Sequence, residues 1–239
     1  MYEVIVLGAT FAAAGVAGQY KEKCLVIERR AQAGYEFFGA LHFGYNNGGK
    51  IHEEAALSLQ KKFAEEKSFL CCDSLIYPFF QECHTIFAAQ LVSVQKIDEG
   101  FLCTVHGASG YTRYIGKKVI DTRCNSEISS YKTYNILMES DTEPAFPHTT
   151  YEKISDKNRY VLFCPVPLSC NYSEARSIAF DVIKQFGQNQ RVIILANEFD
   201  YYVKGEYPRK NGEILIFPSK FYGSPLLAFQ SGECLGKEL

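Results

Sequence analysis

A glycine and a glutamate near the start of the chain have the spacing of a dinucleotide-binding motif. Gly8 ends one apolar run, and Glu28 follows it by 20 residues, at the end of a second apolar run. A glycine turn leading into a helix presents backbone N–H groups and the positive end of the helix dipole, which together bind a pyrophosphate. An acidic residue after the next strand accepts hydrogen bonds from a ribose. The spacing therefore predicts a pyrophosphate site at the turn and a ribose site at Glu28.

The turn departs from the glycine pattern that such sites use. The pattern GxGxxG has glycine in three places, where this chain has Gly8, Thr10 and Ala13. Alanine is tolerated in the third place, because that glycine serves helix–strand packing. Thr10 puts a β-branched side chain where the backbone has to approach the phosphates, although its hydroxyl could donate to a phosphate oxygen. A βαβ unit that binds no nucleotide stays an open alternative.

Other reactive residues give weaker patterns. Cys71 and Cys72 are interpreted as two thiols rather than a redox pair. His42 lies in a glycine-rich loop, and a solvated histidine is the preferred interpretation. No metal is expected, because two cysteine–histidine neighbours lack the matching second pair of a tetrahedral zinc site: Cys83 with His84, and Cys103 with His106. Four tyrosines could line a substrate pocket or be half-buried strand residues, and both interpretations stay open: Tyr201, Tyr202, Tyr207 and Tyr222.

Composition excludes several classes of protein. The chain has 239 residues, 47% of them hydrophobic, which suffices for one large domain or two small ones. With 25 basic and 27 acidic residues, it has no electrostatic reason to bind nucleic acid or an anionic membrane. Its nine scattered cysteines indicate reduced thiols, so we expect a cytoplasmic protein. The interrupted apolar start predicts neither a signal peptide nor a membrane span.

The elements that position Gly8 and Glu28 are predicted to be a β-α-β unit, with strands Tyr2–Leu7 and Lys23–Glu28 around a helix. The polar segment 124–158 is expected to be irregular. Further strands are predicted over Ala89–Ile97, Phe101–His106, Tyr111–Ile115, Lys118–Asp121, Tyr160–Pro165, Arg191–Ala196 and Glu213–Pro218. The first three of these read as a β-meander. Further helices are predicted over His52–Lys67, Ser173–Phe186 and Leu226–Leu239.

Four segments, in this order, carry a resemblance to a known family. They are VLGATFAAAGVA with LVIERR, the glycine-rich Ala33–Leu41, the stretch from Gln90 to Thr122 ending in VIDT, and the closing YGSPLLAFQSGECLGKEL. Together they resemble FAD-dependent oxidoreductases of the class with two dinucleotide-binding domains, close to the FAD-oxidoreductase and glucose-inhibited-division-like branches.

The resemblance implies an α/β fold: a Rossmann-like FAD-binding domain with an inserted β-meander (1–123 plus 219–239) and a smaller α+β substrate domain (124–218). It implies hydride or electron transfer through non-covalent FAD, to or from a small-molecule substrate. It names no catalytic side chain, and the oligomeric state stays open. The residues that it assigns to FAD are Gly8, Ala9, Thr10, Phe11, Ala12, Glu28, Arg29, Gly39, Leu91, Thr122, Arg123, Gly223, Ser224 and Pro225.

Three contact points depart from the family pattern. Thr10 replaces a glycine, Arg123 and Cys124 stand where the family has the end of its ATG motif, and Gly223-Ser224 stands for the usual Gly-Asp. We expect FAD to be retained, because Glu28 keeps its offset. The alternative from another functional class is a cofactor-free binding or regulatory module. A nicotinamide-binding protein is disfavoured, because the 90–122 meander suits flavoproteins.

Overall fold

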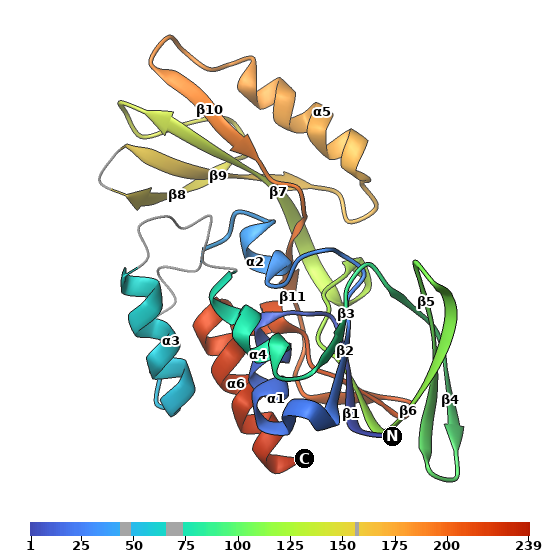
Figure 1. The fold of residues 1–239 in the computed structure, drawn as a ribbon. Helices are drawn as coiled ribbons and strands as arrows, with labels where there is room; N and C mark the ends of the chain where they lie inside the picture. Colours follow the sequence, from blue (N-terminus) through green and yellow to red (C-terminus); the bar gives the residue numbers. More distant parts are fainter. Residues whose placement is uncertain (44–48, 66–73, 156–157) are drawn as a thin grey trace. The chain divides into compact units, whose positions relative to one another are not determined.

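The computed structural model describes residues 1–43, 49–65, 74–155 and 158–239. The chain forms two compact units (Figure 1). Unit 1 comprises Met1–Tyr35, Asn47–Arg123 and Gly205–Leu239, and unit 2 comprises Glu36–Asn46 and Cys124–Lys204. Two segments differ from the predicted division: 36–46 lies with unit 2 and 205–218 with unit 1. The second difference arises because the strands of 205–218 pair with the sheet of unit 1.

Unit 1 is built on an eight-stranded sheet with a parallel centre. Its main path runs β12-β13-β6-β1-β2-β3, and β1 is parallel to both β2 and β6. The carboxyl ends of β1, β6 and β13 therefore meet at one sheet edge, where a doubly wound fold binds its ligands. The bounds are β1 (Tyr2–Leu7), β2 (Cys24–Ile27), β3 (His84–Ile86), β6 (Gly110–Asp121), β12 (Arg209–Asn211) and β13 (Ile214–Ile216).

The predicted meander is confirmed, with one strand longer than expected. Strands β4 (Gln90–Ile97), β5 (Gly100–Gly107) and β6 pair antiparallel in sequence. The predicted strands Tyr111–Ile115 and Lys118–Asp121 are one continuous strand, β6, whose first half pairs with β5 and second half with β1. At the change of partner, Gly116 lies against Ile5, where a Cβ would not fit. The meander and the parallel strands thus share one core.

Two helices of unit 1 pack with their backbones in contact. Helix α1 (Phe11–Tyr20) lies beside α6 (Pro225–Glu238) (Figure 1). A Cβ on Gly15 would overlap the carbonyl of Phe229, and a Cβ on Gly232 would overlap the carbonyl of Ala12. Only glycine permits this approach at the two positions. Helices α3 (Glu54–Glu65) and α4 (Tyr77–Gln81) also belong to unit 1, whereas the short α2 (Tyr35–Phe38) lies in unit 2 except for its first residue.

Unit 2 is a five-stranded antiparallel sheet with helix α5 (Tyr172–Ile183) along one face (Figure 1). Strand β7 is central, because β9 pairs along one edge while β10 and β11 share the other. The strands are β7 (Ser129–Ser140), β8 (Thr150–Ser155), β9 (Arg159–Val166), β10 (Gln190–Leu195) and β11 (Asp200–Val203).

The observed elements confirm the fold class, α/β with a Rossmann-like sheet and a smaller α+β unit, and correct some details. The prediction that 124–158 is irregular is wrong, because β7 and β8 lie there. The N-cap of α5 is Asn171 rather than Ser173, since Asn171 and Glu174 form a reciprocal capping box. In the described part of the chain, no helix is long and apolar enough to span a membrane.

Candidate functional site

The predicted ribose ligand, Glu28, faces the β1–α1 turn in unit 1. Its Oε2 accepts the backbone N–H of Ala9 at 2.8 Å, and its Oε1 accepts that of Arg30 at 2.7 Å. Glu28 is only 4% exposed. The carboxylate is therefore where the spacing predicted it, and it binds the turn itself.

Three hydroxyl groups form hydrogen bonds at the start of helix α1, and two of them accept backbone N–H groups of the helix. Thr10 is the N-cap, and its Oγ1 accepts the N–H of Ala13 at 3.1 Å. The same hydroxyl donates to Thr122 Oγ1 at 2.8 Å, and the Thr122 hydroxyl donates in turn to the carbonyl of Leu7 at 2.9 Å. The N–H of Ala12 donates to Ser219 Oγ at 3.3 Å. The hydroxyls thus connect α1 to the ends of β6 and β13.

Arg123 covers the glycine of the turn. A Cβ on Gly8 would lie 2.7 Å from Arg123 Cγ. The guanidinium is held by Asp121, with Nε–Oδ1 and Nη2–Oδ2 distances of 2.8 and 2.7 Å. This pairing raises the pKa of Arg123, so its charge is permanent. The arginine stem fills space directly above Gly8.

The remaining predicted cofactor residues have varied surroundings. Ser224 is the N-cap of α6, accepting the N–H of Leu227 at 3.2 Å, and Pro225 occupies the first turn. Gly223 has a φ of 71° before that cap. Leu91 packs its side chain on the core of unit 1, Arg29 is exposed, and Phe11 is buried against Phe63. Gly39 belongs to unit 2, where its carbonyl accepts the N–H groups of Asn197 and Glu198.

The turn does not fit a pyrophosphate as it stands. Such a group needs the backbone N–H groups at the turn and the helix start as its donors. Those of Ala9, Ala12 and Ala13 already donate to Glu28, Ser219 and Thr10. Inserting phosphate oxygens would require these side chains to turn away and lose the hydrogen bonds that they accept from the turn.

Ser219 and Asp121 are the residues of this site that sequence reasoning missed. Ser219 follows β13 as Thr122 follows β6, and its N–H donates to the Thr122 carbonyl at 2.9 Å. The signal was available, because residues just after parallel strands converge at one edge.

A second polar cluster lies in unit 2 around His42. Its Nδ1 is 2.7 Å from Oδ2 of Asp200, which is completely buried on β11. Asn135 on β7 donates to the Ala40 carbonyl at 2.8 Å and to Asp200 at 3.4 Å. The His42 side chain is 14% exposed, so the prediction of a solvated loop histidine is wrong. A carboxylate that holds one imidazole nitrogen fixes the ring and its tautomer, as in sites that move protons or bind metals.

The groups around His42 lie in a dry, aromatic environment. The ring is edge-on to Phe163 at a centroid distance of 5.7 Å and tilted against Tyr202 at 6.1 Å. Burial, followed by the charge of Asp200, raises the pKa of Tyr202. Burial also raises the pKa of Glu152 on β8, although His42 opposes this. These neighbours keep their protons more firmly than they would in water.

The four tyrosines do not form one group. Tyr201 and Tyr202 are half-buried on β11 of unit 2, where Tyr202 stacks on Tyr131 at 4.0 Å. Tyr207 and Tyr222 belong to unit 1 and pack on Phe221. The strand-residue interpretation therefore describes the first two. Cys71 and Cys72 lie outside the described residues.

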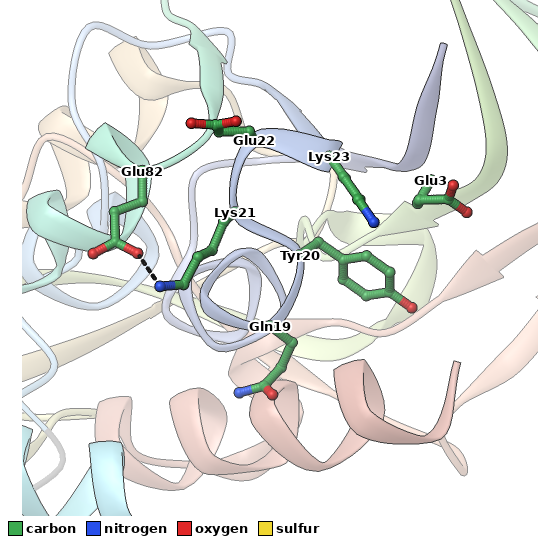
Figure 2. A pocket seen from close by; sticks show the side chains of 7 residues that line it. All are labelled: Glu3, Gln19, Tyr20, Lys21, Glu22, Lys23 and Glu82. Atoms are coloured by element: carbon green, nitrogen blue, oxygen red, sulfur yellow. Dashed lines mark ion pairs between the residues drawn. The ribbon is translucent and has the colours of Figure 1, made fainter.

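A surface hollow of unit 1 lies away from the predicted site residues. Figure 2 shows its lining of both charges, with Lys21 paired to Glu82 at 3.3 Å. The lining comes from the start of β1, the end of α1, the 3-10 turn that follows it and the residue after α4: Glu3, Gln19, Tyr20, Lys21, Glu22, Lys23 and Glu82. The hollow is therefore separate from the β1–α1 turn.

Comparison with known proteins gives a fold likeness. No protein-family model and no curated sequence matches the chain. It is similar to the solved structure of aklavinone-11 hydroxylase in complex with FAD and aklavinone, with 12% identity over 99% of this chain and a TM-score of 0.56. For p-nitrophenol 4-monooxygenase from Pseudomonas putida the values are 12%, 99% and 0.56. For CabE, an aromatic hydroxylase from angucycline biosynthesis, they are 10%, 90% and 0.52.

The likeness covers only part of several of these proteins. The chain spans 55% of the length of CabE, 62% of aklavinone-11 hydroxylase and 77% of the monooxygenase. At these identities the likeness describes the backbone and not the chemistry of the site. Over the matched part, the chain shares the backbone fold of these two hydroxylases and of the monooxygenase.

Proposed function

We propose that this chain uses the flavoprotein fold without holding FAD at its β1–α1 turn, and that it acts as a binding or regulatory module. One observation carries the proposal: the chain's own side chains accept the turn's N–H groups at Ala9, Ala12 and Ala13. The turn then has a structural role, because its hydrogen bonds link helix α1 to the ends of β1, β6 and β13. The partner that we propose is a small molecule.

The cluster around His42 supports a binding role for unit 2. Asp200 and Asn135 hold the imidazole, and aromatic rings limit the access of water. Orienting a single histidine by buried polar groups is how proteins prepare a side chain to recognise a ligand or to exchange a proton with it. This support does not depend on a flavin.

A second candidate, an FAD-dependent oxidoreductase, is favoured by the fold likeness and by Glu28. Bound FAD would supply hydride or electron transfer. Glu28 at the end of β2 would hold the ribose, and Ala9, Ala12 and Ala13 the pyrophosphate. Thr10 and Ser219 would have to release the last two N–H groups first. The cytoplasmic location and the specific family branch remain predictions.

Flavin binding decides between the two candidates. The purified full chain is scanned for flavin absorbance and then titrated with FAD while flavin fluorescence is followed. The first proposal expects a colourless protein and no saturable binding. A double variant, Thr10→Gly with Ser219→Ala, frees two donors and is expected to gain affinity for FAD, whereas Ser126→Ala in unit 2 is the matched control. Retained flavin that is lost in Glu28→Ala would overturn the proposal and establish the second candidate.

A further inference from the structure

Three side chains of different chemistry converge where helix α3 meets helix α6 in unit 1. They are His52, Glu53 and Cys234, whose ligand atoms all lie within 4.8 Å of one another. His52 Nε2 and Cys234 Sγ are each 3.8 Å from Oε1 of Glu53. This set is separate from the turn at Gly8 and from the His42 cluster.

We propose that His52, Glu53 and Cys234 form a binding site for a thiophilic divalent cation such as Zn²⁺. An imidazole, a carboxylate and a thiolate are the three ligand types that zinc takes from proteins. With zinc–ligand bonds of about 2.0–2.3 Å, the edges of a tetrahedron are about 3.4–3.6 Å long. The two distances of 3.8 Å from Glu53 Oε1 exceed these edges by only a few tenths of an ångström.

The backbone that carries these ligands is held in place by α6. Gln230 Oε1 accepts the N–H groups of both His52 and Glu53, at 2.6 and 3.1 Å. One turn later, Glu233 Oε2 accepts the N–H of Ala56 at 3.2 Å. Gln230, Glu233 and Cys234 lie on one face of α6, because residues three and four apart share a face. The backbone of His52 and Glu53 is therefore held beside Cys234 before any ion arrives, which lowers the entropic cost of binding.

Exposure leaves room for the final adjustment and for a fourth ligand. The His52 side chain is 66% exposed, so its ring can rotate toward the other two groups without disturbing the core. The Glu53 side chain is 18% exposed and Cys234 is half-buried, which places the site at a water-accessible surface. Three protein ligands and one water make the open coordination of exchangeable or catalytic zinc.

The ammonium of Lys237 competes with a metal ion for the carboxylate of Glu53. Its ammonium forms an ion pair with Oε2 of Glu53, on the oxygen that does not face Cys234. A cation would therefore bind beside a positive charge that weakens it. Replacing Lys237 by methionine keeps the stem and removes the charge, so this variant should bind the metal more tightly.

Cobalt binding tests the proposal, because Co²⁺ adopts the zinc geometry and reports its ligands optically. The reduced full chain is titrated with Co²⁺, followed by displacement with Zn²⁺. We expect thiolate-to-cobalt absorption in the near ultraviolet and the visible bands of a four-coordinate ion. His52→Ala and Cys234→Ser should each weaken binding at least about tenfold, because even losing an outer-shell partner costs that much. Lys237→Met should strengthen it.

A matched pair of substitutions separates this site from other thiols. Cys83→Ser and His84→Ala remove a neighbouring cysteine and histidine of unit 1 and should leave the titration unchanged. His52→Ala replaces a largely exposed side chain, so circular dichroism should show an intact fold. No thiolate band at millimolar Co²⁺, or a band that survives both His52→Ala and Cys234→Ser, would overturn the proposal.

Discussion

The β1–α1 turn of unit 1 and the His42 cluster of unit 2 are both buried polar networks, but they use their polar groups differently. At the turn, side-chain oxygens of Glu28, Thr10 and Ser219 accept backbone N–H groups. In unit 2, the carboxylate of Asp200 holds a titratable ring. A network whose partners are backbone groups stabilises the fold, whereas one that ends on a histidine sets the state of a reactive group.

The contact beneath the turn should give the largest effect. Gly232→Ala would press a methyl group into the carbonyl of Ala12 in the first turns of α1. Because the clash is with the backbone of α1 rather than with a flexible side chain, we expect unit 1 to fail to fold or to lose at least about 4 kcal/mol of unfolding free energy. Urea denaturation measures this. Gly107→Ala, whose Cβ would make an ordinary 3.6 Å contact with Ala89, is the control.

Removing the buried carboxylate of unit 2 should come next. Asp200→Ala leaves His42 and Asn135 without a common acceptor, at an expected cost of about 3 kcal/mol. Asp200→Asn keeps the shape and should cost less. NMR of the imidazole protons distinguishes the histidine states, and the bonded Nδ1 proton should become exchangeable in both variants. An unchanged imidazole spectrum in Asp200→Ala would mean that the carboxylate does not orient the ring.

One hydroxyl of the turn should have a moderate effect on stability. Thr122→Val is nearly isosteric but removes the link from Thr10 to the Leu7 carbonyl, for an expected cost of about 1–2 kcal/mol. Neither the wild type nor the variant should bind FAD, since the hydroxyls of the turn serve the fold in our proposal. A loss of flavin binding with unchanged stability would reverse the roles that we give to the two networks.

The smallest effect concerns the pH dependence of unit 2. Burial raises the folded-state pKa of Glu152 above 4.5, so the folded state binds this proton more tightly than the unfolded chain does. The wild type therefore loses stability as the pH rises from the ordinary carboxyl value through the raised one. Glu152→Gln should be more stable than the wild type at pH 7 and equal to it below about pH 4. The exposed Glu127→Gln removes the same charge elsewhere in unit 2 and is the matched control.

Local patterns predicted the elements well where a strand is continuously apolar or where a turn contains glycine. The apolar runs of β1, β2 and β9 and the turns of the meander were recognisable from the sequence. Strand β7 was missed because buried polar residues interrupt its apolar pattern, among them Lys132, Thr133 and Asn135. Their partners are supplied by tertiary structure, as in the bond from Lys132 Nζ to the Cys170 carbonyl. Hydrophobic periodicity carries no signal for such a strand.

The position of the site was predictable from the sequence, but the hydrogen-bond partners of its groups were not. The offset of Glu28 from Gly8 located the turn, and Thr10 was recognised as a departure. That Thr10 bonds Thr122, 112 residues away, follows only from the sheet order. The same holds for His42 and Asp200, which are 158 residues apart. Spacing rules describe what a motif can bind, and distant residues decide whether its donors are still available.

During synthesis of the protein, helix α1 has to wait for α6 before the face between them is covered. Helix α1 is made first, but its glycine-lined partner follows the whole of unit 2 in the chain. On the ribosome, the residues of unit 2 are complete while α1 still has an uncovered apolar face. Chaperones that bind nascent apolar helices should therefore associate with this chain until residue 232 has emerged, and a ribosome stalled before that point should display a folded unit 2 beside an unfinished unit 1.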